Sequence, residues 1–240
     1  LALGDIDRCA RTYYPTTEEY GVRKLLRSRH ELVKLRQAIV NQIRGLLNAY
    51  KRVPPGACLY LPKCLAWLRE CSLPNADLEF VLKQWRQALE EVQARVVEMD
   101  ARIVEQARGD AAATALQSIP SVGPQTALTL RYELGDVSRF KNARAVASAA
   151  GLVPRVSQSA DTAHHGPLTK RGNPELRWIV SEWAVRLLAK NEQVKAWAAP
   201  RLRKKHKNKV RIALARRLLV GVYFTLKTGE EFSLSRCLAA

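Results

Sequence analysis

The sequence predicts a mainly α-helical protein, in which a long antiparallel coiled-coil hairpin precedes a compact helical domain with a helix-hairpin-helix motif. Two long segments carry apolar residues at alternating steps of three and four, which is typical of helices that pack along a seam. Positive charge is concentrated in the second half of the chain. We therefore expect a hairpin domain over residues 1–110, for linkage or dimerisation, and a second domain over residues 111–240.

The first stripe begins at residue 22 and ends at residue 50. It consists of Val22, Leu25, Arg29, Leu32, Arg36, Ile39, Ile43, Leu46 and Tyr50. We expect this helix to begin near Thr16 or Thr17 and to end before Pro54, because proline cannot continue a helix. Arg29 and Arg36 occupy positions where apolar residues are expected, so they either extend to the edge of the seam or face a second chain.

The second stripe has the same alternation of steps. It consists of Leu78, Leu82, Trp85, Leu89, Val92, Val96, Met99 and Ile103. Asn75 or Asp77 provides a helix cap, and Gly109 provides an end. The connector between the two helices contains a short apolar helix near residues 65–69. The hairpin pairs within one chain or forms part of a dimer, and its sequence contains no catalytic pattern.

The segment LQSIPSVGPQTALTLRYELGD, residues 116–136, resembles a helix-hairpin-helix motif. Its expected turn is Ile119, Pro120, Ser121, Val122 and Gly123. A helix that starts after such a turn presents unpaired backbone N–H groups, which attract a DNA phosphate without reading the base sequence. Ser121 replaces the first glycine of the usual motif. The turn either contacts the DNA backbone or has a purely structural role, and the sequence does not choose between these two functions. A further helix is expected near residues 142–151.

The stretch GLVPRVSQSADTAHHGPLTKRGNPELRW, residues 151–178, is expected to form a polar loop followed by a helix that begins at Pro174. A serine attacks phosphate only where cations stabilise the developing charge and a base accepts its proton. Ser157 and Ser159 are both candidates by spacing. The surrounding side chains are suited to these roles: Arg155, Lys170, Arg171 and Arg177 for phosphate, and Asp161, His164 and His165 for proton transfer.

The charge of the chain is +18, with a pI near 10.1, which indicates a polyanionic partner such as nucleic acid. Residues 1–110 hold 18 Lys and Arg against 14 Asp and Glu, so the remaining residues carry 22 against 8. The densest basic segment, residues 201–211, contains no acid. Its cationic residues are Arg201, Arg203, Lys204, Lys205, Lys207, Lys209 and Arg211. It forms a phosphate-binding loop, a helix start or a linker, and it does not distinguish RNA from DNA.

Five cysteines occur at positions 9, 58, 64, 71 and 237, an odd number without the spacing of a zinc site. We interpret them as reduced thiols of a cytoplasmic protein and expect no metal site in this chain. No apolar run reaches the length of a membrane span, and no signal peptide is evident. The first residues lack an initiator Met and begin abruptly, so we expect the chain to be a portion of a longer protein.

Several stretches together resemble the IS110-type insertion-sequence transposases, which are related to the Piv-type DNA invertases. The resemblance covers most of residues 1–235. It rests on four runs in the same order: ELVKLRQAIVNQIRGLLNAY, IPSVGPQTALTLRYELGDVSRFKNARAVASAAGLVPR, TKRGN with LRW, and NKVRIALARRLLVGVYFTLKTGEEF. The resemblance implies a C-terminal transposase domain that carries out DNA strand exchange with one serine, which becomes joined to DNA phosphate.

The matching serine is Ser159, because the family pattern has serine-glycine four residues after Pro-Arg. Ala160 replaces that glycine. The resemblance also implies a structured guide RNA that pairs with donor and target DNA, and an N-terminal RuvC-like domain whose acidic residues bind magnesium. That domain is expected to end near Leu1-Ala2-Leu3, so we assign no metal to Asp5 or Asp7 and expect the isolated chain to be inactive.

Two other functions compete with a recombinase. The chain is alternatively a non-catalytic module that binds nucleic acid and dimerises through its coiled coil, as a homodimer or a larger oligomer. A scaffold with incidental charge is the third possibility, and it would bind no nucleic acid at physiological salt.

Overall fold

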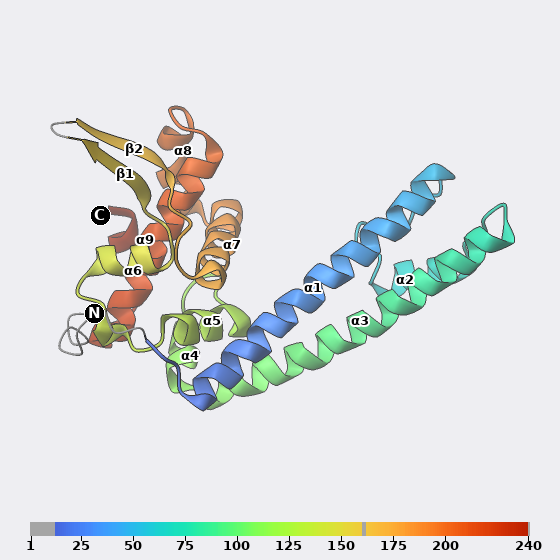
Figure 1. Ribbon diagram of the computed structural model, residues 1–240, viewed down its shortest axis with the longest axis horizontal. Helices are drawn as coiled ribbons and strands as arrows, with labels where there is room; N and C mark the ends of the chain where they lie inside the picture. The colour runs from blue at the N-terminus through green and yellow to red at the C-terminus, as the bar shows by residue number, and fades with distance from the viewer. Residues whose placement is uncertain (1–12, 160–161, 240) are drawn as a thin grey trace, which may run out of the picture. The chain divides into compact units, whose positions relative to one another are not determined.

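A computed structural model of the chain describes residues 13–159 and 162–239, with the backbone alone at 156–159, 162–165 and 167. The described part is mainly α-helical, as predicted (Figure 1). Its elements are α1 (Thr17–Ala49), α2 (Pro62–Glu70), α3 (Ala76–Gly109), α4 (Ala111–Leu116), α5 (Pro124–Leu134), η2 (Val137–Arg139), α6 (Ala143–Ala149), β1 (Pro154–Ser159), β2 (Thr162–Leu168), α7 (Pro174–Lys190), α8 (Glu192–Leu202), α9 (Lys207–Thr228) and α10 (Leu234–Ala239).

The fold divides into two compact units. One contains residues 25–128, and the other contains residues 129–239 with the described part of residues 1–24. These boundaries fall inside α1 and α5. The expected division at residue 110 into two domains stays a prediction.

The first unit is built on α1 and α3, which run antiparallel. Arg29 on α1 pairs with Asp100 at 2.8 Å, and Arg36 donates to Gln93 at 2.7 Å, so the order of partners reverses along α3. The two arginines therefore pair across the hairpin within the chain. Arg36 also lies over the ring of Tyr60, 3.8 Å from its centroid. These interactions offset the loss of apolar contact at the two charged positions.

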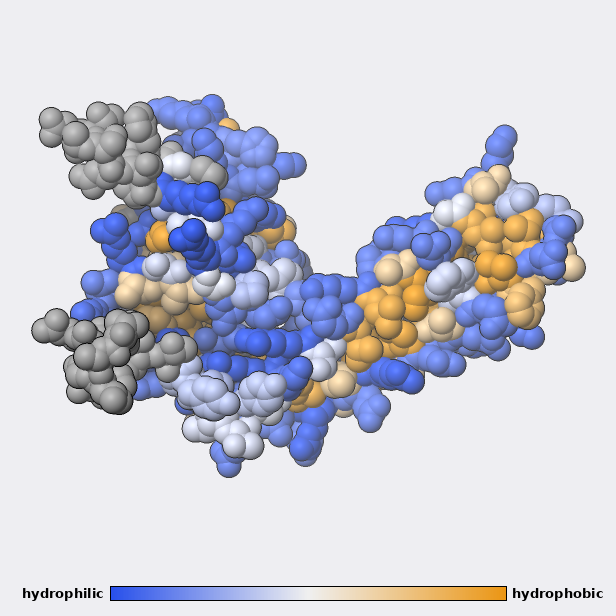
Figure 2. All heavy atoms as spheres, viewed as in Figure 1, coloured by the Kyte–Doolittle hydropathy of each residue, from blue (hydrophilic) through white to orange (hydrophobic). Residues whose placement is uncertain are grey.

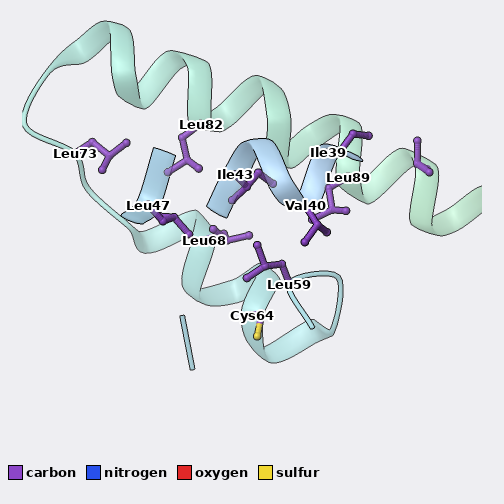
Figure 3. Close-up of a cluster of buried hydrophobic side chains, with 11 residues drawn as sticks. Ile39, Val40, Ile43, Leu47, Leu59, Cys64, Leu68, Leu73, Leu82 and Leu89 are labelled. Atoms are coloured by element: carbon purple, nitrogen blue, oxygen red, sulfur yellow. The ribbon is translucent and has the colours of Figure 1, made fainter. Parts of the chain in front are cut away.

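A cluster of apolar side chains joins α1, α2 and α3 (Figure 3). Leu82 and Leu89 of the predicted second stripe are buried in it, and Val96 and Ile103 are buried further along α3. The N-cap expected for α3 is present, since Asn75 accepts from the Asp77 N–H at 2.7 Å. Gly109 is the last residue of this helix, and Asp110 is its C-cap. The coiled-coil geometry itself stays a prediction.

The first predicted stripe is wrong in part of its register. The buried face of α1 consists of Leu26, His30, Ile39, Val40, Ile43 and Leu47. Leu25 and Leu46 are only half-buried, while the leucine that follows each of them is buried. Adjacent leucines allow two nearly equivalent apolar faces, and packing against α2 and α3 selects between them.

The second unit packs mainly through α7 and α9, which make extensive contact. Trp183 of α7 and Leu218 and Val222 of α9 are fully buried in its core. The Tyr223 hydroxyl donates to the Phe140 carbonyl at 3.2 Å, and the two rings meet edge to face. α6 also packs on α9. The prediction of a helix from Pro174 is confirmed, as is the helix expected near residues 142–151, where α6 follows its cap Asn142.

Residues 154–159 and 162–168 form the two paired strands of a β-hairpin, so the prediction of a loop there is wrong. β1 and β2 are antiparallel, with Ser157 opposite His164 and Ser159 opposite Thr162 (Figure 1). The register shifts between Pro154 and Val156. Backbone hydrogen bonds stabilise such a two-stranded ribbon without a continuous apolar face, which is why hydrophobic periodicity did not predict it.

Candidate nucleic-acid interface and catalytic serine

Ser159, the predicted nucleophile, is the last residue of β1, and its backbone pairs with that of Thr162. Ser157 lies two positions earlier on the same strand. The side chains of both serines, and those of His164 and His165, are outside the described residues, as is all of Asp161. The choice between the two serines and the proton-transfer roles therefore stay predictions. Both serines are carried by a paired strand.

Two glycines fix the base of this β-hairpin. Gly151 has φ +67°, and a Cβ there would lie 2.7 Å from the Arg171 carbonyl oxygen. Gly172 has φ +125°, and a Cβ would lie 2.4 Å from the Ala149 carbonyl oxygen. These conformations and distances exclude a side chain at both positions. The end of α6 and the start of α7 approach each other closely at the base of the strands.

Arg177 bridges the same two segments from α7. Its Nη1 donates to the carbonyl oxygens of Ala150 and Lys170, each at 3.1 Å. Lys170 has φ +51°, which turns the chain out of β2 towards α7. Arg177 therefore positions the β-hairpin with one guanidinium nitrogen. Its predicted contact with phosphate is untested, and only the rest of the guanidinium is available for it.

Asn173 completes this junction. Its N–H donates to the Ala149 carbonyl at 2.7 Å, and its Oδ1 caps α7 by accepting from Glu175 and Leu176 N–H groups. Its Nδ2 donates at 2.6 Å to Glu133, which is 3% exposed. The Gly-Asn pair of TKRGN thus joins α5, α6 and α7. Sequence analysis singled out the cations of this motif and missed the structural role of Asn173.

The other predicted phosphate contacts are exposed. Arg155 lies on β1, and Lys170 and Arg171 follow β2. Within the described part of the chain, no ion pair engages any of the three. Their positive charge is therefore uncompensated beside the β-hairpin, where it attracts an anion.

The predicted helix-hairpin-helix segment contains two helices joined by a tight turn, α4 and α5. Ile119 and Val122 of the turn are buried, while Pro120, Ser121 and Gly123 are exposed. Ser121 adopts φ +62°, the conformation that glycine has in the usual motif. The exposed side of the turn therefore leads directly into the start of α5, and contact with a phosphate there stays a prediction.

The basic segment forms the end of α8, a turn and the start of α9, so the prediction of a helix start is confirmed. Most of its cations are exposed, namely Arg203, Lys204, Lys205, Lys207 and Lys209. Arg201 instead lies over the Trp197 ring, 4.2 Å from its centroid, and Arg211 is half-buried. The first turn of α9 contains no acid, so side-chain cations add to the positive end of the helix dipole. An anion bound there would relieve this repulsion.

Metal and membrane features are absent from the described residues. No group of three or more His, Cys, Asp or Glu side chains in this part of the chain is arranged to hold a metal ion. Four described cysteines, at positions 58, 64, 71 and 237, are free thiols. Asp5 and Asp7 lie outside the described residues. No described helix is long and apolar enough to span a bilayer.

The chain is similar in sequence to known transposases. Residues 113–199 match the model of the transposase IS116/IS110/IS902 family. A probable family 20 transposase of Pseudomonas aeruginosa is 28% identical over 208 residues, covering 83% of this chain and 61% of the relative. The transposase for insertion sequence element IS1111A of Coxiella burnetii is 30% identical over 225 residues, covering 90% and 61%.

The class of protein to which the chain is similar is therefore that of the insertion-sequence transposases. Within that class, residues 113–199 match the IS110 type. A putative transposase y4rJ of Sinorhizobium fredii, 30% identical over 247 residues, agrees with this assignment. The chain spans about 61% of the length of these relatives.

Proposed function

We propose that the chain is the coiled-coil and transposase-domain portion of a DNA recombinase that moves an insertion sequence. Ser159 is the nucleophile of this proposal. Its oxygen forms a bond to a DNA phosphorus, and the bridging oxygen of the broken DNA strand leaves with the bonding electrons and takes up a proton. The observation that carries the proposal is the matching serine on a β-hairpin whose base is held by Arg177, Gly151 and Gly172.

The cations beside the β-hairpin support the electrostatic part of this step. Attack on a phosphodiester accumulates negative charge on the phosphate oxygens, and positioned cations lower the barrier. Arg155, Lys170 and Arg171 are exposed and are not engaged in described ion pairs, so they are suited to this role. Arg177 has one nitrogen committed to the hairpin base, and we assign it mainly to positioning.

The partners in this proposal are duplex DNA and a structured guide RNA. The turn at residues 119–123 contacts the DNA backbone, and the basic segment from Arg201 to Arg211 binds phosphates of DNA or RNA. Magnesium belongs to the acidic RuvC-like domain that the family implies, and we derive no step through it from these residues. Working alone, the chain would bind nucleic acid without recombining it.

The test of this function is the variant Ser159→Ala in the intact transposase, with Ser157→Ala as its matched control. Removal of the nucleophile reduces strand exchange by a factor of at least about 10³. Folding and nucleic-acid affinity are expected to stay unchanged, because one hydroxyl contributes little to either. Full recombination by Ser159→Ala, or loss confined to Ser157→Ala, would remove Ser159 from the assignment.

A second candidate function is a non-catalytic module that binds nucleic acid and dimerises. Hydrophobic surface on the helical hairpin favours the dimerisation part of it (Figure 2). The exposed apolar residues of the hairpin include Leu35, Phe80, Val81 and Val97. Such residues are typical of protein interfaces. This function predicts salt-sensitive binding and a concentration-dependent dimer, with no serine joined to phosphate in any assembly.

A further inference from the structure

A cavity of about 700 Å³ lies between α9 and the C-terminal segment that ends in α10. Its lining includes Val220, Gly221 and Cys237, and Phe224 borders it with 49% of its surface exposed. Most of the exposed surface of the lining is apolar. None of the predicted site residues lines this cavity.

Close packing of the C-terminal segment forms the cavity. A Cβ at Gly221 would lie 2.4 Å from Cys237 Sγ and 2.7 Å from Phe232, so only glycine permits this approach. Phe232 in turn packs against the buried Trp183, with 5.8 Å between their rings. The Arg217 Nη1 donates to the Cys237 carbonyl at 3.1 Å. The cavity is therefore bounded by fixed elements.

Charges of both signs lie at the mouth of the cavity. Arg236 pairs with Glu230 at 3.2 Å, and Glu231 is beside them. Arg216, which is exposed, lies on the α9 side. The carboxylates can accept N–H groups of a ligand, while Arg216 attracts an anion. A suitable ligand therefore has a planar apolar part, hydrogen-bond donors on that part, and a negative charge at one side.

A stripe of cations leads to the cavity along α9. Lys209, Arg216 and Phe224 are separated by seven and eight residues, which places them on one face of the helix. At 1.5 Å per residue, each step covers roughly 10–12 Å. This stripe begins at Lys209 in the first turn of α9, next to the basic turn between α8 and α9. A strand of nucleic acid following the stripe would bring its bases to Phe224.

We propose that this cavity binds an unpaired nucleobase of a single-stranded nucleic acid, with Phe224 as the stacking surface. The sugar-phosphate backbone follows Lys209 and Arg216, and the carboxylates accept from the base. This inference rests on the proposed nucleic-acid function and adds a single-strand site to it. An apolar segment of another protein would also fit the cavity, but it would make no favourable contact with the cations Lys209 and Arg216.

The test compares Phe224→Ala, Phe224→Trp and the unchanged 240-residue chain. Fluorescence anisotropy measures their affinities for labelled oligothymidylate, oligouridylate and a DNA duplex, each of about 12 nucleotides per strand. Val185→Ala is the control, because Val185 is also a partly exposed apolar residue of this unit. Loss of one base stack weakens single-strand binding by about tenfold in Phe224→Ala. Duplex affinity changes by less than about twofold, and Phe224→Trp retains single-strand binding, because tryptophan also stacks.

Preference for the DNA or the RNA strand identifies the natural source of the base, and either preference supports the site. Equal single-strand affinity of Phe224→Ala and the unchanged chain would overturn the inference while leaving duplex binding and the proposed function intact. An equal loss on single strand and duplex would also overturn it, since that pattern reports a general structural effect. Failure of the unchanged chain to bind any of the three probes would contradict the proposed function itself.

Discussion

At the base of the β-hairpin, Gly172 has a backbone conformation that residues with a side chain rarely adopt. Its φ is +125°, and a Cβ would lie 2.4 Å from the Ala149 carbonyl oxygen. Asn173, the next residue, uses the same carbonyl as a hydrogen-bond acceptor. A substitution here therefore strains the backbone and displaces a bond that joins α6 to α7.

Gly172→Ala is expected to lower the free energy of unfolding by about 2 kcal/mol or more, measured by urea denaturation. Gly21→Ala is the matched control, because Gly21 lies within α1 and no atom approaches its Cβ position within 4 Å. Alanine at that helical position raises stability by roughly 0.5–1 kcal/mol. Equal effects of the two substitutions would show that the hairpin base tolerates a side chain.

Sequence reasoning found the charged residues of this region more readily than its structural ones. Lys170 and Arg171 stood out because a basic turn beside serines suggests phosphate chemistry. The roles of Gly151 and Asn173 depend on carbonyl groups that lie far away in the chain, that of Arg171 for Gly151 and that of Ala149 in α6 for Asn173. Only the tertiary arrangement reveals those acceptors. The one sequence feature that could have predicted a structural role here was the Gly172-Asn173 pair immediately before Pro174.

At the scale of elements, the pair between Arg29 and Asp100 fixes the register of α1 against α3. Two hydrogen bonds at 2.8 and 3.3 Å join the side chains, which are 18% and 46% exposed. Sliding one helix by a turn would separate the charges and leave Arg29 beside apolar neighbours. The pair thus compensates for a cation placed on the seam.

A double-mutant cycle with Arg29→Met and Asp100→Leu is expected to give a coupling energy of about 0.5–1 kcal/mol at low salt. The exposed pair of Glu31 and Lys34 on α1 is the control, with side chains 67% and 54% exposed, and its coupling is expected to be smaller because solvent screens the charges. Chemical denaturation of all variants supplies both values. A coupling energy of zero between Arg29 and Asp100 would show that this pair does not fix the register of α1 against α3.

The helices were predictable because long apolar stripes and caps repeat over many residues. The β-hairpin was not, since residues 154–168 are mostly polar and contain no strong two-residue turn signal. α8 and α10 were also missed. α10 is only six residues long, and its position depends on the contact between Gly221 and Cys237. The cavity beside α10 could therefore not be predicted from the sequence.

At the scale of the whole molecule, the surplus of positive charge is distributed for binding a polyanion. Exposed cations lie beside the β-hairpin and in the turn between α8 and α9. Contacts of lysine with phosphate release counterions, so each contact contributes to the salt dependence of affinity. The chain's net charge of +18 predicts strong binding at low salt and steep loss as salt increases.

The double variant Lys204→Ala/Lys205→Ala is expected to reduce the slope of log Kd against log salt by about two, measured by anisotropy with duplex DNA. Lys63→Ala/Lys83→Ala is the matched control, because both lysines are exposed on the helical hairpin. It should leave the slope unchanged. If both double variants changed the slope equally, the salt dependence of DNA binding would result from the net charge of the whole chain and not from phosphate contacts of the basic turn.

The most direct test of the recombinase mechanism is a search for the covalent intermediate. The intact transposase, with its acidic domain, is incubated with guide RNA, donor DNA and target DNA, then denatured and digested for mass spectrometry. The mechanism predicts a nucleotide joined through phosphate to the peptide containing Ser159, and its absence in Ser159→Ala. Productive strand exchange without any adduct on Ser159 would contradict it and assign the chemistry to the acidic domain.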